Sequence, residues 1–339
     1  MIGAEQGDVA VRWRRLGMDD ADAAAALLRE AHGRNLAWDI ALPTAGTTGP
    51  DVRQALSDGA ALIGAVGADG IAPVAMGGIW PQGEIGWLAV ADRHAGQGFG
   101  RAVLVATEGL ALSLGHDRVH LRTASAHPWL GAWYRRHGYV ERAAADGACD
   151  LRLERDLASA WRPLPRPRCA WAERDVRAAA YHDYEWGLWV EDARDLFERL
   201  TLEVFQTGLS WRTVLTKRMA LRQGLFGFDP VRLAAADDAA LERFLAAPGV
   251  IHSPRKFAAT VHNARVLLDV ARAHGSFAIY LRSRPVEELY AELRPRLRLF
   301  GPSVARSLFE SVGLVPAPHA HDCFAAPARP PAPYRDVRS

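Results

Sequence analysis

RCAWAERDVRAAAYHDYEWG (168–187) and GLVPAPHAHDCF (313–324) decide the fold of the second half of this 339-residue chain, because they place soft metal ligands at both ends of one segment. Borderline-soft Zn²⁺ favours a closed tetrahedral site of thiolates and imidazoles, and four protein ligands leave no open position for a catalytic water. A structural zinc ion held by four such residues would join the two ends of the segment. The alternative is two buried thiols and two solvated histidines. The expected ligands are Cys169, His182, His319 and Cys323.

Other patterns accompany these ligands in a fixed order. They are C-A-W (169–171), Y-H-D-Y-E-W-G (181–187), L-E-V-F-Q-T-G-L-S-W (202–211), G-L-V (313–315) and H-x-x-x-C (319–323). Together they resemble the DNA-3-methyladenine glycosylase I family. The resemblance implies an all-α helix-hairpin-helix glycosylase fold with a structural zinc. It also favours His319 over the alternative ligand His321, because only His319 keeps the H-x-x-x-C spacing.

The resemblance further implies a pocket for a single base. An enzyme that acts on a base inside duplex DNA must flip that nucleotide out of the stack, and aromatic faces replace the lost stacking at about 1–3 kcal/mol per base. By resemblance, Tyr181, Trp186 and Trp211 supply these faces, and Glu203 reads the base. Glu203 lies beside Leu200 on the apolar face of a predicted helix, where a carboxylate is costly to bury without a partner. This placement indicates a functional role for Glu203. The alternative is a solvated surface glutamate.

The expected reaction follows from this carboxylate. Methylation at N3 gives adenine a positive charge, which favours an ionised Glu203 and makes the base a good leaving group. We expect Glu203 to accept a hydrogen bond from the exocyclic amine while water attacks the sugar and the C1′–N9 bond breaks, without lyase chemistry. The expected partner is alkylated double-stranded DNA.

A second DNA contact is expected at a turn between two predicted helices. The turn resembles the hairpin with which helix-hairpin-helix proteins hold a DNA phosphate, with backbone N–H groups from Gly249 and Ile251 and a charge from Lys256. Such contacts position a protein but carry no sequence information. His252 and Ser253 stand where the family tends to have Arg and Asn. The alternative is a plain connection between helices.

The first half of the chain is an α/β pattern around a glycine-rich turn. Short apolar runs at 61–66, 72–79 and 85–91 predict strands, and H-A-G-Q-G-F-G-R-A (94–102) leads into a predicted helix. Glycines let the backbone approach a ligand closely, and a helix N-terminus directs free N–H groups outward, as pyrophosphate binding requires. The turn therefore predicts an anion site.

This turn, with the strand L-A-V (88–90) before it, resembles the GNAT superfamily of N-acetyltransferases, which implies a mixed central sheet with flanking helices. The resemblance implies binding of acetyl-CoA and of an unknown acetyl acceptor. Tyr134, in the pattern Y-x-x-x-G-Y, would protonate the departing thiolate; the alternative is an ordinary helix aromatic. Ala95 and His127 depart from the family pattern. The implied acetyl-CoA contacts are Leu88, Val90, Gly96, Gln97, Gly98, Gly100 and Arg101.

Charge and proline content divide the chain. Residues 1–157 carry 15 Arg, no Lys and 19 acidic residues, a net charge of −4, whereas residues 158–339 carry 26 basic and 20 acidic residues, a net charge of +6. A polyanionic partner is therefore expected on the second half. Prolines near residue 165 favour an extended spacer. The expected organisation is a GNAT-like domain at 1–157, a proline-rich linker at 158–167, a glycosylase domain at 168–325 and a disordered tail at 326–339.

Cysteine usage and hydropathy indicate the compartment. Two of the three cysteines are assigned to the metal, which leaves only Cys149 and no disulfide framework. This usage fits a reducing cytoplasm. No apolar run approaches the roughly 20 residues of a membrane span, and nothing resembles a signal peptide, so no membrane partner is expected.

Three hypotheses follow. The first is a monofunctional DNA repair glycosylase for N3-methyladenine, fused to a GNAT domain whose acceptor is unknown. The second is an acetyltransferase whose C-terminal half is a non-catalytic module that docks on DNA or protein. The third is a non-catalytic binder of damaged DNA.

Overall fold

The computed structural model describes residues 12–34, 40, 43–67, 72–127, 129–142 and 150–326. The chain forms two compact units, Met1–Tyr184 with Asp322–Ala325, and Glu185–His321 with Ala326–Ser339. Cys149 and the predicted tail beyond Ala326 lie outside the described residues.

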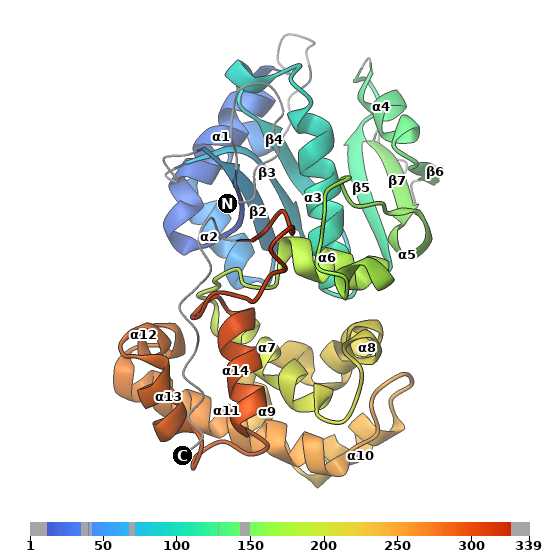
Figure 1. Ribbon diagram of the computed structural model, residues 1–339. Helices are drawn as coiled ribbons and strands as arrows, with labels where there is room; N and C mark the ends of the chain where they lie inside the picture. Colours follow the sequence, from blue (N-terminus) through green and yellow to red (C-terminus); the bar gives the residue numbers. More distant parts are fainter. Residues whose placement is uncertain are drawn as a thin grey trace. The chain divides into compact units, whose positions relative to one another are not determined.

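The first unit contains two sheets (Figure 1). The first is antiparallel, in the order β1-β2-β3-β4, and the second is also antiparallel, in the order β5-β7-β6. A parallel bridge between Glu84 and His120 joins the sheets at the start of β4. The strands are β1 (Arg12–Leu16), β2 (Ala61–Val66), β3 (Pro73–Ile79), β4 (Ile85–Val90), β5 (Arg118–Ala124), β6 (Val140–Arg142) and β7 (Asp150–Asp156).

Two helices explain why the central strands are apolar throughout. Every residue of β2 and β3 is buried. The helix α1 (Ala21–Gly33) packs on the sheet face that carries Met76, and α3 (Phe99–Ser113) packs on the opposite face at Gly77. A sheet covered on both faces has no solvent-facing positions, so its strands lose the polar alternation. The predicted strands and the glycine-rich turn before α3 are confirmed.

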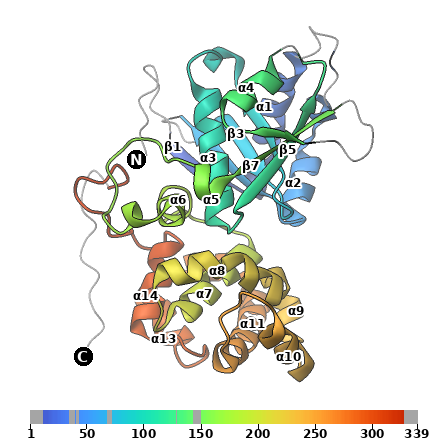
Figure 2. The ribbon, with the colours of Figure 1, turned by 90° about the vertical axis from the view of Figure 1, so that its right-hand side faces the viewer.

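The remaining helices of the first unit lie around these sheets and along the connection to the second half. They are α2 (Gly49–Ser57), α4 (Leu130–Arg136), α5 (Leu157–Ala160) and α6 (Val176–Tyr184). α6 lies against α3 (Figures 1 and 2). Cys169 and His182, two of the expected metal ligands, therefore belong to the same compact unit as the α/β half. The domain boundaries expected from the sequence stay a prediction.

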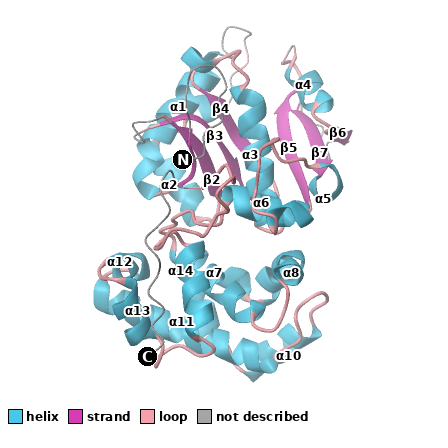
Figure 3. Cartoon of the chain, viewed as in Figure 1, coloured by secondary structure: helices cyan, strands magenta, loops and turns pink. Residues whose placement is uncertain are grey.

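In the second unit, the regular structure that is described is helical (Figure 3). α7 through α12 each begin at an Asp or Ser whose side chain accepts from the backbone of the first turn, as helix N-caps do. Their apolar faces form one core. The helices are α7 (Ala193–Gln206), α8 (Trp211–Gly224), α9 (Pro230–Ala234), α10 (Asp238–Ala246), α11 (Pro254–His274), α12 (Phe277–Arg282), α13 (Val286–Leu293) and α14 (Pro302–Ser311).

Across the described part of the chain, none of the helices combines the length and the apolar character that crossing a bilayer requires.

Candidate functional site

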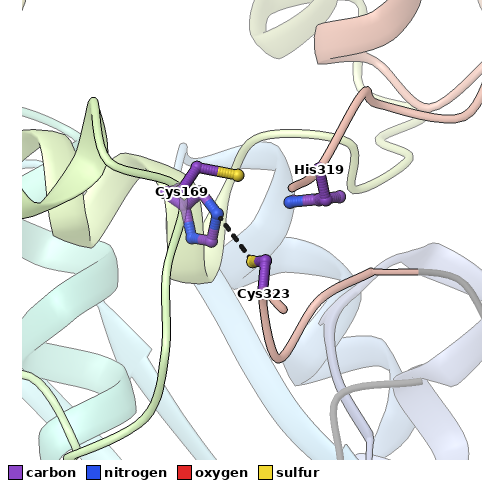
Figure 4. Close-up of side chains that lie close together, drawn as sticks. Cys169, His319 and Cys323 are labelled. Carbon is purple, nitrogen blue, oxygen red and sulfur yellow. Dashed lines mark hydrogen bonds between the residues drawn. The ribbon is translucent and has the colours of Figure 1, made fainter. Parts of the chain in front are cut away.

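The four expected metal ligands lie close together (Figure 4). One ligand atom from each of Cys169, His182, His319 and Cys323 lies within 4.8 Å of the others. A tetrahedral zinc ion holds such atoms roughly 3.3–3.8 Å apart, and the Cys323 Sγ to His182 Nε2 distance, drawn dashed, is 3.4 Å. The alternative ligand His321 is exposed and is not part of the group. The donor set and its spacing fit zinc.

A buried carboxylate orients one of the imidazoles. His182 Nδ1 lies 2.9 Å from Asp183 Oδ1, and Arg168 donates to both Asp183 oxygens at 2.7–3.0 Å. A histidine that donates from Nδ1 to a carboxylate presents its Nε2 to a metal ion. The side chains of these three residues are nearly inaccessible to solvent, so water does not compete for these contacts.

The segment after Cys323 is also attached to the start of the glycosylase-like half. Phe324 N donates to Pro167 O at 2.9 Å, and its ring centroid lies 5.7 Å from that of His182. The ring also faces the Arg166 guanidinium at 4.4 Å. The two ends of the predicted clamp therefore meet through the backbone as well as through the ligand group.

Glu203 lies near the end of α7 and is buried, with 3% of its surface exposed. The alternative of a solvated glutamate is therefore wrong. Burial raises the pKa of Glu203 to about 7, and the nearby Glu310 carboxylate adds to the rise. A hydrogen bond from Ser307 and the charge of Arg199 act in the opposite direction. Near neutral pH this carboxyl is poised between its two protonation states.

The three expected base-pocket aromatics have different surroundings. Trp186 is half-buried, with its ring centroid 4.8 Å from that of His319. Trp211 opens α8 and packs on the helical core. Tyr181 is buried in the first unit, 6.4 Å from the Trp171 ring. Their assembly with Glu203 into one pocket stays a prediction.

The expected DNA hairpin is the exposed connection between α10 and α11. Gly249 has a φ of +79°, and its carbonyl accepts from Lys217 Nζ at 2.8 Å. The phosphate contacts expected from Gly249 and Ile251 stay predictions. The phosphate contact expected from Lys256 also stays a prediction; its Nζ donates to Phe205 O and Thr207 O, both at 2.7 Å. The last carbonyls of a helix lack intrahelical donors, and Lys256 satisfies those at the end of α7.

The glycine-rich turn of the first unit has the backbone that an anion site requires. Gly96 and Gly98 have φ values of +75° and +86°, a region that only glycine enters without strain. Gly98 is the N-cap of α3, and residues 95–98 are exposed. A Cβ at Gly100 would meet only Trp133, at 3.8 Å. Arg101 is exposed on the first turn of the helix. These positions leave the N-terminus of α3 open to a ligand.

Side chains at the C-terminal end of α1 and just after it contact the edge of β4. His32 Nε2 lies 3.0 Å from Leu88 O, and Arg34 Nη2 donates to Val90 O at 3.2 Å. Gln97 turns back within its own loop and donates to Arg93 O at 2.9 Å. Leu88, Val90 and Gln97 therefore have partners inside the protein, and their contacts with acetyl-CoA stay predictions.

Tyr134 is buried, with 7% of its surface exposed. Burial raises the pKa of Tyr134, and the charge of Glu108 raises it further. A phenol in this setting stays protonated, as a general acid must before it acts. His127, one of the departures from the family pattern, accepts through Nδ1 from the backbone N–H of Leu130, the first residue of α4, at 3.2 Å.

Comparison with known proteins supports the two halves separately. The family model described as "Methyladenine glycosylase" matches residues 171–294. DNA-3-methyladenine glycosylase 1 of Escherichia coli (strain K12) is 40% identical over 116 residues, which is 34% of this chain and 62% of the relative. DNA-3-methyladenine glycosylase of Haemophilus influenzae is 31% identical over 178 residues, which is 46% of this chain and 96% of the relative. This chain belongs to the DNA-3-methyladenine glycosylase family.

A solved structure of 3-methyladenine DNA glycosylase I is 34% identical in sequence, with a TM-score of 0.44. The match covers 48% of this chain and 100% of the solved chain. In the first half, residues 31–139 match the "Acetyltransferase (GNAT) family" model. The two family matches place the glycosylase half after a GNAT-like α/β half in one chain.

A buried charge network in the glycosylase half was missed from the sequence. Arg218 on α8 donates to both oxygens of Glu185 at 2.7 and 2.9 Å, and to Glu198 on α7 at 2.8 Å. Arg222 donates to both oxygens of Glu198 at 2.8 Å. Glu185 belongs to the Y-H-D-Y-E-W-G pattern, and the i,i+4 spacing of the two arginines was the available signal.

A third arginine, Arg199, stabilises the same region through hydrogen bonds to backbone carbonyls. Arg199 Nη1 donates to Glu185 O at 3.1 Å and to Leu188 O at 3.0 Å, and also to Ser311 O at the end of α14. The start of the second unit, α7 and α14 are thereby held together. Arg168 and Asp183, which support His182, were also missed, although both are adjacent in sequence to predicted ligands.

Proposed function

We propose that this chain is a monofunctional DNA base-excision glycosylase that removes adenine methylated at N3. The substrate is alkylated double-stranded DNA, and the reaction is hydrolysis of the C1′–N9 bond after the nucleotide is flipped. Glu203 accepts a hydrogen bond from the exocyclic amine and stabilises the positive charge of the methylated ring. Tyr181, Trp186 and Trp211 supply stacking faces, and water completes the hydrolysis.

The buried Glu203 is the observation that supports this proposal most strongly. It lies on α7 of a family member with 3% of its surface exposed, and no ion pair of its carboxylate is found among the described residues. Burying a carboxylate without such a partner is unfavourable. A cationic base supplies the missing charge and lowers the pKa of Glu203. Neutral adenine does not, so the carboxylate favours the damaged base.

The proposed metal is a structural zinc ion held by Cys169, His182, His319 and Cys323. Zinc bound by four protein ligands supplies stability rather than a reacting water. The chain itself prepares the site, because Asp183 fixes the His182 ring. The ion would hold the start and end of the glycosylase-like half together.

Release of free base from methylated duplex DNA by the full chain tests the proposal. We expect N3-methyladenine to be the main product, and Glu203→Gln to reduce the rate by about 10²-fold, as loss of a hydrogen bond to a charged partner costs. Glu288→Gln is the matched control, because Glu288 is exposed on α13. Tight binding of methylated DNA without release would instead support the non-catalytic binder.

We also propose that the GNAT-like half binds acetyl-CoA at the turn before α3. The exposed glycines at the helix N-terminus support this second function. Acetyl-CoA at 100 times its dissociation constant should stabilise the protein by about 2.7 kcal/mol, measured as a thermal shift, and Gly98→Val should abolish the shift. Acetyl transfer to an amine without any base release would favour the docking-module hypothesis.

A further inference from the structure

Helix α6 carries Tyr181 and His182 and packs against α3 at a single glycine. A Cβ placed on Gly109 of α3 would lie 2.3 and 2.4 Å from ring carbons of Tyr184, and 2.9 Å from Trp161. Real Cβ atoms do not approach ring atoms this closely. Glycine inside a helix costs about 1 kcal/mol relative to alanine, so its use at this position has a packing reason.

Two fully buried aromatics fill this contact. Trp161 and Tyr184 have 0% and 1% of their surfaces exposed, and their ring centroids lie 6.3 Å apart at 74°. Trp161 Nε1 also donates to Val105 O of α3 at 3.1 Å. The indole thus joins the connecting segment, α3 and α6, and edge-to-face aromatic pairs of this kind define a relative orientation.

A charged contact holds the other end of α6. Arg177 Nη2 donates to Asp117 Oδ1 at 2.5 Å, and Asp117 O accepts from Leu157 N at 2.7 Å. Arg177 lies on the first turn of α6, and Tyr184 is its last residue. Tyr181 and His182 lie between these two contacts, so both side chains depend on where α3 holds the helix.

We propose that α3 of the GNAT-like half is the docking surface for α6, and that Gly109, Trp161 and Tyr184 are positioning residues for the metal cluster and for Tyr181. The inference rests on the proposed zinc site and base pocket. The alignment with the Haemophilus influenzae relative covers 96% of that protein but only 46% of this chain. That relative therefore has no room for a GNAT-like half, and the docking surface is a feature of the fused chain.

Zinc release from the full-length protein tests the inference. Protein loaded with zinc is mixed with a chromophoric chelator, and the release rate is compared between Gly109→Ala and Gly33→Ala. Gly33 also lies in a helix, but a Cβ added there would have nothing within 4 Å. We expect Gly109→Ala to release zinc at least tenfold faster than wild type, and Gly33→Ala to release it at the wild-type rate. Equal rates for the two variants would overturn the docking role.

A double variant separates positioning from general damage. Tyr184→Leu removes the ring that a Cβ at Gly109 would strike. The fold-increase in zinc release rate of the double variant Gly109→Ala with Tyr184→Leu should therefore be smaller than the product of the fold-increases of the two single variants. Strictly multiplicative effects would show that the two sites do not meet. Trp161→Phe keeps a ring but loses the bond to Val105 O, and it supplies a milder test if Gly109→Ala does not fold.

Hydrogen exchange keeps this inference distinct from the zinc proposal. If wild type binds no zinc, the proposed metal site fails, but α6 amides of Gly109→Ala should still exchange faster than those of Gly33→Ala. Amides of α7 and α8 should be unchanged in both. Unchanged protection of α6 in Gly109→Ala would reject the docking surface whether or not the metal binds.

Discussion

Two glutamates on α7 are equally buried but have opposite surroundings. Glu198 has 1% of its surface exposed and Glu203 has 3%. Glu198 accepts from Arg218 and from Arg222 at 2.8 Å. Glu203 has no ion pair among the described residues, and burial raises its pKa to about 7. The Glu198 carboxylate is part of a structural ion-pair network, whereas the Glu203 carboxylate can still pair with a positively charged ligand.

The comparison distinguishes structural from functional burial. A buried charge that is fully paired contributes little net stability, but its partner cannot be removed without leaving a charge alone. A buried carboxylate without an ion pair costs stability in every folded molecule, and such strain is retained where a ligand repays it. Four substitutions test this distinction.

The largest effect is expected at Arg218. Arg218→Met would leave the carboxylate of Glu185 without its bidentate partner, and removing one member of a buried ion pair costs roughly 3–5 kcal/mol. Denaturant unfolding of the full chain would measure the loss. Arg222→Met is the matched control, because Arg222 is partly exposed and Glu198 would keep Arg218. A loss for Arg218→Met no larger than that for Arg222→Met would contradict the network.

The sequence was sufficient for features that depend on local pattern. The motifs that resemble the glycosylase family implied the cluster of Cys169 and His182 with the C-terminal pair, and helical periodicity placed Glu203 on the apolar face of α7. The glycine-rich turn predicted an open anion site before a helix. In each case neighbouring residues carry the signal, because a helix repeats every 3.6 residues and a turn has fixed backbone angles.

Pairings between distant segments could not be read in the same way. Arg218 and Glu185 are 33 positions apart, and their contact depends on how α8 packs against α7. The hydrogen bond of Lys256 to the Phe205 carbonyl at the end of α7 also depends on tertiary packing, because the two residues are 51 positions apart. The contact of Gly109 with Tyr184 joins two halves that the sequence had separated by a linker. No local pattern encodes such partners.

The second effect concerns pH. The folded-state pKa of Glu203, about 7, lies above the value near 4.5 expected when unfolded, so wild type loses stability as pH rises between these values. Glu203→Gln does not titrate there. Its stability advantage over wild type should therefore be small below pH 4.5 and grow to roughly 3 kcal/mol above pH 7. Unfolding curves at pH 5 and pH 8 would measure this gap, and a constant gap would show that Glu203 is not desolvated.

The third effect concerns Asp183, a buried carboxylate that, like Glu198, has charged partners, and that lies beside the proposed metal ligands. Asp183→Asn removes the charge that accepts from His182 Nδ1, and loss of such a supporting carboxylate weakens metal binding by about 10–100-fold. Chelator competition would measure the zinc affinity. Glu173→Gln is the control, because it neutralises an exposed carboxylate four positions from Cys169. Equal affinities in the two variants would remove Asp183 from the supporting role.

The smallest effect concerns a buried hydroxyl without a partner. Tyr184 is fully buried, and its hydroxyl has no hydrogen-bond partner within the described residues. Tyr184→Phe keeps the ring against Gly109 and removes only the unsatisfied group, so we expect a gain of about 1 kcal/mol. Tyr280→Phe is the control for which the opposite sign is expected. The Tyr280 hydroxyl donates to Glu292 at 2.9 Å, so its removal should destabilise the protein. Thermal unfolding distinguishes the two signs. A loss of stability in Tyr184→Phe would mean that the Tyr184 hydroxyl finds a hydrogen-bond partner in solution.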